Sequence, residues 1–166
     1  MAAERKSARV TTRPIPVRHA MKFNASTHRR LPTVTGCMWA VAAEIDSNLV
    51  GVAIVGHPNA RLANDGRCLE VLRVAVVEGA RNACSALYGA CSRAARGMGA
   101  EDMWTFVHED ESGHSLRAAG WVKVAVTDGG EWGRDGRQRE LAIDPNPKTK
   151  WAVAWGRLAR RQSEAA

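Results

Sequence analysis

The chain has 166 residues, a length that suits a single domain with a sizeable core. Its 24 Lys and Arg residues outnumber 17 Asp and Glu residues, and the formal net charge of +7 favours polyanionic partners such as nucleic acid or a coenzyme phosphate. No apolar stretch is long enough to cross a bilayer, and the basic N-terminus lacks an apolar secretory core. We therefore expect a cytoplasmic protein with no membrane partner.

The first third of the chain predicts an edge strand, a short helix and an antiparallel hairpin. Residues 1–7 are polar and are expected to be disordered, 8–12 to form the strand and 17–27 the helix. The hairpin is predicted from apolar runs at 36–43 and 48–55, separated by a cluster of turn-forming residues.

Three basic residues in this part of the chain are candidates for substrate contact. His28 and Arg30 precede a turn closed by Pro32, and His57 stands at the end of the second hairpin strand. A histidine can donate to, accept from or orient a substrate. A surface loop for His28, and a simple turn before Pro58 for His57, are the alternative interpretations.

The run 69–77 is rich in Val and Leu, which is typical of a strand covered on both faces. Period-two alternation predicts that Glu70 points the same way as Leu72, Val74 and Val76. A carboxylate on an apolar face is poorly solvated, so its pKa rises toward the range of a general base. The alternative is a strand-end glutamate that reaches water or pairs with an arginine.

A turn at 78–81 leads from this strand into a helix with Asn82 as the expected N-cap. The residues expected on its inner face are mostly small: Ala83, Leu87, Ala90, Cys91 and Ala94. The free N–H groups at the start of such a helix can bind an anion, and Arg81 would add positive charge. Glycines at 97 and 99 end the helix.

The second half of the chain predicts a strand at 103–107, parallel to the strand at 69–77 because a helix joins them. His108 and three acidic residues follow, and then a short helix that carries Ser115. These acidic residues are also favourable helix-start residues, which is an alternative to a functional role.

Two further strands are predicted at 121–126 and 150–155 and are expected to pair with each other. Between them, Trp132 and several arginines occupy a glycine-rich stretch that could stack on bases and contact phosphates, or could simply be a loop. The four cysteines lack a CxxC pair and read as reduced, and no metal site is expected. Residues 157–166 read as a basic tail.

The two motifs at 69–96 and 112–121 carry a family resemblance. The strand, loop and small-residue helix of the first, and the helix ending in Gly-Trp of the second, are similar to those of the GNAT superfamily of acyl-CoA-dependent N-acyltransferases. The position of Glu70 in LEVLRVAV resembles that of enzymes, histone-type acetyltransferases among them, that keep a catalytic glutamate on this strand. The match covers roughly the second half of a domain of GNAT length.

The resemblance implies an acyl-CoA cofactor, most simply acetyl-CoA, and a role for each candidate residue. Glu70 would be the base, with His108 and Ser115 as further catalytic candidates. Amides at Val74 and Val76 would align the pantetheine. The pyrophosphate would be held by Arg81, Asn82, Ala83 and Cys84, and the amine acceptor would be contacted by His28, Arg30 and His57.

The chain departs from the GNAT pattern at two places. Its loop has Ala80-Arg81-Asn82-Ala83-Cys84 where glycines are usual, and Leu116 takes the place of a tyrosine general acid, so another group would have to protonate the thiolate. The Arg-Asn loop and the upstream His-Arg-Arg-Leu-Pro also resemble a small phage-type branch related to the Mom-type proteins, which modify adenine in DNA.

The sequence therefore predicts an α/β protein with a GNAT-like fold. We expect a central, mixed but mostly antiparallel sheet with one splayed parallel pair, flanked by helices, in a single domain at 8–156. The predicted function is acyl transfer to a primary amine, with Mom-type modification of DNA or a binding module without chemistry as alternatives. We expect a monomer or a homodimer.

Overall fold

The computed structural model describes residues 9–27, 34–127 and 146–165. Within these residues, seven strands form one sheet in the order β1-β2-β3-β4-β5-β7-β6. The strands are β1 (Val10–Pro14), β2 (Cys37–Ile45), β3 (Asn48–Gly56), β4 (Cys68–Val76), β5 (Asp102–His108), β6 (Trp121–Thr127) and β7 (Lys148–Val153). The helices are α1 (Val17–Thr27), α2 (Ala83–Gly97), α3 (His114–Ala118) and α4 (Arg157–Glu164), with a 3-10 turn at Arg61–Ala63.

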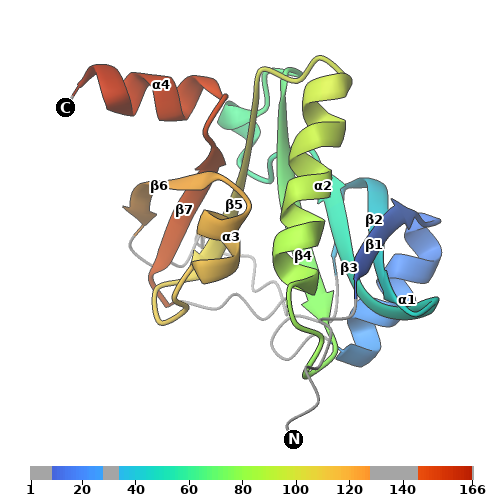
Figure 1. The fold of residues 1–166 in the computed structure, drawn as a ribbon. Helices are drawn as coiled ribbons and strands as arrows, with labels where there is room; N and C mark the ends of the chain where they lie inside the picture. Colours follow the sequence, from blue (N-terminus) through green and yellow to red (C-terminus); the bar gives the residue numbers. More distant parts are fainter. Residues whose placement is uncertain (1–8, 28–33, 128–145, 166) are drawn as a thin grey trace, which may run out of the picture.

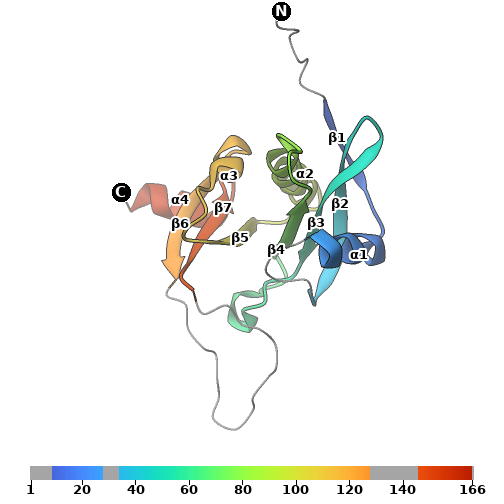
Figure 2. The ribbon, with the colours of Figure 1, turned by 90° about the horizontal axis from the view of Figure 1, so that it is seen from below.

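Helices cover the sheet on both faces. α2 and α3 lie on one face and α1 lies on the other, so the sheet forms the middle layer (Figures 1 and 2). The core is divided in the same way, with one apolar cluster under α2 and a second cluster under α1. This arrangement confirms the predicted α/β class with a mixed, mostly antiparallel sheet.

The hairpin of β2 and β3 turns more tightly than the sequence pattern predicted. Its two strands remain paired up to Ile45 and Asn48, so Asp46 and Ser47 alone form the turn. Both residues have positive φ, 49° and 64°, the conformation that two-residue hairpins require. The predicted five-residue turn cluster is therefore mostly strand.

A β-bulge in β4 overturns one prediction about Glu70. Val71 pairs with Val55 of β3 but Arg73 pairs with the adjacent Ile54, which leaves Leu72 as an extra residue. A bulge reverses the alternation that follows it. Leu72 consequently packs in the cluster under α1, whereas Val74 and Val76 pack against the cluster under α2. The prediction that Glu70 shares a face with Val74 and Val76 is wrong for this reason.

Strands β4 and β5 run parallel, as predicted, but they pair over a short distance. Their register joins Cys68 to Asp102, Leu69 to Met103 and Glu70 to Trp104, and no later pair follows. β5 continues along β7 as far as His108, and β4 continues along β3 as far as Val76. The sheet thus divides into two halves beyond Glu70, which confirms the predicted splayed pair.

The connection from β4 to α2 uses two left-handed residues. Gly79 has φ of 80° and Asn82 has φ of 64°. Asn82 stands at the N-cap position but makes no side-chain cap hydrogen bond, so the predicted capping role is wrong. Asparagine is tolerated in this left-handed conformation better than most residues with a Cβ, and this explains its presence at position 82, directly before α2.

The expected basic tail at 157–166 begins as a helix that packs on the sheet. The buried Asp102 accepts hydrogen bonds from the backbone N–H of Leu158 at 2.8 Å and of Met103 at 2.9 Å. Arg157 pairs with Asp65 at 2.6 Å and with Glu101 at 3.1 Å. These contacts hold the first turn of α4 against β5 and the loop that precedes β4.

Some predictions fall outside the described residues. These are the disordered tail at 1–7, the substrate candidates His28 and Arg30, and the glycine-rich stretch with Trp132. Among the residues that the structure describes, none of the helices has the length and apolar character needed to span a membrane.

Candidate functional site

Glu70 is the buried carboxylate at the point where β4 and β5 separate. Its side chain belongs to the α1 face, and only 6% of the residue is exposed. The Oε2 atom accepts hydrogen bonds from the backbone N–H of Asn59 at 3.3 Å and from Nε1 of Trp104 at 3.2 Å. Both of these hydrogen bonds from described residues end on Oε2, and no described residue donates to the other oxygen, Oε1.

The surroundings of Glu70 favour a proton acceptor. Burial raises the pKa of the carboxyl group, since the charged form loses its hydration. The hydrogen bonds from Asn59 and Trp104, and the positive charges of Lys150 and Arg73, oppose this increase. The net effect is a raised pKa, so the group binds protons more readily than an exposed glutamate.

Beyond Glu70, some backbone N–H groups of β4 point toward the space between β4 and β5. The N–H of Val77 donates to the carbonyl of Val50 on β3 at 2.9 Å. Successive N–H groups of a strand point to opposite edges, so those of Val76 and Val74 point away from β3 and toward β5. The structure therefore leaves the two predicted amides without a partner strand on that side.

The start of α2 supplies a second set of amides. The first N–H groups of a helix have no acceptor within the helix, and the Asn82 side chain does not reach them. Cys84 and Ser85 belong to this first turn, and Arg81 is exposed beside it. The hydroxyl of Ser85 donates to the Asn82 carbonyl at 3.0 Å, away from the amides. This end of α2 can bind an anion.

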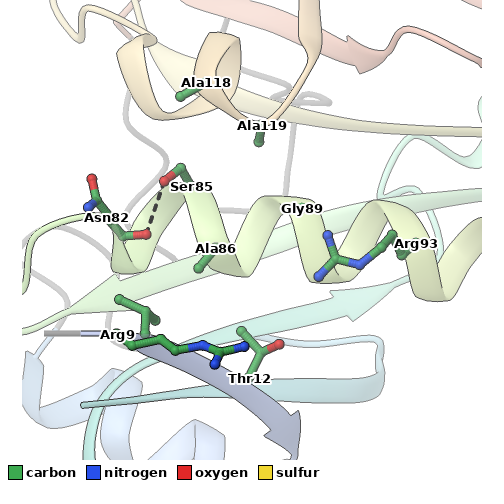
Figure 3. Close-up of a pocket in the computed structure, with 10 residues that line it drawn as sticks. Arg9, Thr12, Asn82, Ser85, Ala86, Gly89, Arg93, Ala118 and Ala119 are labelled. Carbon is green, nitrogen blue, oxygen red and sulfur yellow. Dashed lines mark hydrogen bonds between the residues drawn. The ribbon is translucent and has the colours of Figure 1, made fainter. Parts of the chain in front are cut away.

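A hollow of about 600 Å³ extends along α2 from this first turn (Figure 3). It is lined by β1 with the residue before it, by α2 and by the end of α3, through Arg9, Val10, Thr12, Asn82, Ser85, Ala86, Gly89, Arg93, Ala118 and Ala119. The hollow lies on the α2 side of the sheet, whereas Glu70 lies on the α1 side. A ligand in contact with both would have to pass between β4 and β5.

Two hydroxyl groups lie where the β4–β5 pairing ends. Thr105 of β5 donates from Oγ1 to the carbonyl of Val71 on β4 at 2.9 Å, in place of a backbone bond. The buried Tyr88 of α2 lies within hydrogen-bond reach of Thr105 and stacks edge-on against Trp121. Burial raises the pKa of Tyr88, so its hydroxyl keeps its proton at neutral pH.

The structure brings together some predicted site residues and separates others. Cys84 and Ser115 lie near each other between α2 and α3, and Ser115 acts on the pKa of the Cys84 thiol. His108 is 9% exposed and shares the Trp104 face of β5, so it is on the opposite side of the sheet from Ser115. His57 follows Gly56, the β3 partner of Glu70, and is exposed. The catalytic and binding roles of these four residues remain predictions.

Sequence reasoning missed the residues that surround Glu70 from other strands. Trp104, Lys150 and Asn59 come from β5, β7 and a loop, and Tyr88 was counted only as part of a helix. Trp104 and Lys150 lie near Glu70 because their strands pair side by side in the sheet, and strand pairing is not visible in one sequence. The single tyrosine among 166 residues was the available signal for Tyr88.

Solved structures with a similar fold are acetyltransferases. The chain superimposes on an IAA acetyltransferase from Bacillus cereus with a TM-score of 0.61 and 13% identity, covering 87% of this chain and 99% of that one. For a GNAT family acetyltransferase from Elizabethkingia anophelis with acetyl-CoA bound, the TM-score is 0.59 and the identity 12%, over 87% and 97%. An acetyltransferase of Bacillus subtilis in complex with CoA matches with a TM-score of 0.58 and 13% identity, over 88% and 97%.

These likenesses show that the chain has the fold of the GNAT acetyltransferases. No protein-family model and no curated relative matches the sequence.

The hydrogen bond from Trp104 predicts a measurable effect on Glu70. In Trp104→Phe the pKa of Glu70 should rise further, because the carboxylate loses an N–H donor. Carbon-13 NMR titration of labelled glutamate carboxyl groups measures this, with Glu70→Gln assigning the signal. Trp39→Phe is the matched control, since Nε1 of Trp39 is buried without a partner in the described structure. An unchanged pKa in Trp104→Phe would contradict this account of the site.

Proposed function

We propose that the protein is an acyl-CoA-dependent N-acyltransferase that uses acetyl-CoA and a primary amine. The observation that carries the proposal is Glu70, a buried carboxylate at the point where β4 and β5 separate, whose hydrogen bonds from described residues both end on Oε2. The fold and the solved neighbours with CoA or acetyl-CoA support it.

The residues present fit the phosphates and the amide-bearing arm of such a cofactor. The open amides of the first α2 turn, with Arg81 nearby, suit a pyrophosphate. Arg9 and Arg93 line the adjoining hollow, where they would meet further phosphate charge. The N–H groups of Val74 and Val76 face the space between the strands and would orient an amide-bearing arm.

Acetyl-CoA supplies the acyl group as a thioester. Oε1 of Glu70 would take a proton from the attacking amine, directly or through a water molecule. The bonds from Asn59 and Trp104 hold Oε2 in place and would leave Oε1 for the amine. The proton then passes to solvent when the acceptor leaves.

The structure also offers a group that can meet the departing sulfur in place of Leu116. Leu116 is 2% exposed and lies in the apolar cluster under α2, without a proton to give. The hydroxyl of Tyr88 lies beside Thr105 at the end of the β4–β5 ladder. Because its pKa is raised, Tyr88 would donate a hydrogen bond to sulfur and keep its proton, and the released thiolate would be protonated by water.

Replacing Glu70 tests the base. Glu70→Gln should lower turnover about 10²- to 10³-fold while leaving the affinity for CoA unchanged, because the amide cannot take a proton. The wild-type rate should fall as the pH decreases through the raised pKa of Glu70, above the ordinary glutamate value of 4.5.

Release of free CoA measures the rate, and calorimetry measures the affinity. Glu44→Gln is the control, since Glu44 lies on β2 and pairs with Arg13. Full turnover in Glu70→Gln with saturating acceptor would rule out this carboxylate as the base. Absence of any CoA binding by the wild-type protein would rule out the acyltransferase.

The role of Tyr88 can be tested apart from packing. Tyr88→Phe keeps the ring against Trp121 and should lower turnover about tenfold, with little change in the KM for acetyl-CoA. Because the chain has one tyrosine, 3-fluorotyrosine gives a single fluorine-19 resonance. This resonance should shift with CoA and much less with desulfo-CoA, which lacks the sulfur. Equal shifts together with full turnover in Tyr88→Phe would disprove the contact with sulfur.

A second candidate function is Mom-type modification of adenine in DNA on the same fold. The net charge of +7 and the exposed arginines along the hollow favour this alternative. It predicts that the affinity for duplex DNA falls about 10³-fold between 50 and 200 mM salt, as several phosphate contacts would require. Filter binding measures this, and mass spectrometry of the treated DNA detects modified adenine. Failure to bind duplex DNA at 50 mM salt would exclude the alternative.

A further inference from the structure

A cationic and aromatic surface adjoins Glu70 on the α1 face of the sheet. The indole of Trp104, which donates to Glu70, also carries the ammonium of Lys150 over its ring at 4.0 Å from the centroid. The same ammonium is 5.7 Å from the centroid of Phe106, a residue that is 36% exposed. Glu70, Trp104, Lys150 and Phe106 are therefore neighbours on one face.

Among the residues that the structure describes, no carboxylate is in direct contact with the positive charge of Lys150. No ion pair joins it to another described residue, and its close neighbours are aromatic rings. Asp102 and Glu70 are the carboxylates that act on it from a longer distance. Asp102 is 1% exposed and already accepts two backbone N–H groups, and Glu70 accepts from Asn59 and Trp104.

Other cations add positive charge on this face of the sheet. Arg73 lies near Glu70 and is half-buried, and Lys148 is two residues from Lys150 on the same face of β7. Two positive side chains, Lys150 and Arg73, thus act on a single functional carboxylate. An acceptor with several positive charges would be repelled from this position, and an acceptor with a negative charge would be attracted.

We propose that the acceptor is an amine with a flat apolar body and an anionic group, a carboxylate or a phosphate. Its flat part lies against Phe106, its anionic group pairs with Lys150, and its amine reaches Oε1 of Glu70. The proposal rests on the acyltransferase function and adds the chemical class of its acceptor. It excludes polyamines and lysine-rich peptides as preferred acceptors.

A matched series of benzylamines separates charge from shape. The anionic probes are 4-(aminomethyl)benzoate and 4-(aminomethyl)phenylphosphonate, the neutral probe is 4-(aminomethyl)benzamide, and the cationic probe is 4-(aminomethyl)benzamidine. We expect kcat/KM for acetyl transfer to be about fivefold higher for an anion than for the amide, and lowest for the amidine, as a partly solvated charge pair allows. The two anions distinguish a carboxylate acceptor from a phosphate acceptor.

Lys150→Met is the test variant, since it keeps the unbranched stem over Trp104 and removes the charge. The preference for an anion over the amide, compared within each variant, should shrink to within about twofold in Lys150→Met. Lys123→Met on β6, an exposed position, is the control and should keep the preference. Calorimetry of each probe, with and without desulfo-CoA, gives the same comparison without any transfer.

The outcomes separate this proposal from the acyltransferase itself. Acetyl transfer with equal rates for all probes, or a preference that persists in Lys150→Met, would overturn the acceptor class and leave the acyltransferase standing. No CoA binding would overturn the acyltransferase, and the calorimetric arm would still decide whether the surface selects anions. Tighter binding of the anions that is lost only in Lys150→Met supports the proposal.

Discussion

The structure depends on how far β4 and β5 remain paired. Three backbone pairs hold them together, and the ladder then ends at Glu70 and Trp104. Beyond that point each strand follows a different partner, and Thr105 satisfies the Val71 carbonyl with a side chain. The bulge at Leu72 gives β4 the change of direction that this separation requires. An opening between strands would normally leave unpaired backbone groups, and here those groups face the space that a ligand arm would fill.

The bulge also decides which functional groups lie on the same face of the sheet. Without the bulge, Glu70 would share a face with Val74 and Val76, and the base would lie on the same side as the α2 hollow. With it, the carboxylate faces the α1 side, next to Trp104 and Lys150, while the hollow stays on the α2 side. A donor and an acceptor could therefore approach from opposite faces and meet at the opening, as direct transfer between two bound substrates requires.

Two opposing electrostatic effects act on the pKa of Glu70. Burial favours the protonated acid, while two hydrogen-bond donors and the nearby cations favour the carboxylate. Trp104 has two roles in this balance, since its N–H holds the carboxylate and its ring carries the ammonium of Lys150. Cation and carboxylate are thereby kept apart by an indole instead of joining in a salt bridge, and both remain available to a third group.

The sequence by itself determined most of the elements and their order, although α4 was expected to be a tail. Apolar periodicity located β4, α1 and α2 to within a residue or two, and the glycines after α2 and α3 located their ends, because these features depend on neighbours along the chain. The sequence also singled out Glu70, since a carboxylate within an apolar run can be recognised from the sequence alone. Only the tertiary structure decided the face of Glu70, the left-handed role of Asn82, the docking of α4 and the grouping of Trp104, Lys150 and Tyr88. The physical reason is that a single extra residue in a strand, or the partner of a strand, is set by contacts between segments distant in sequence.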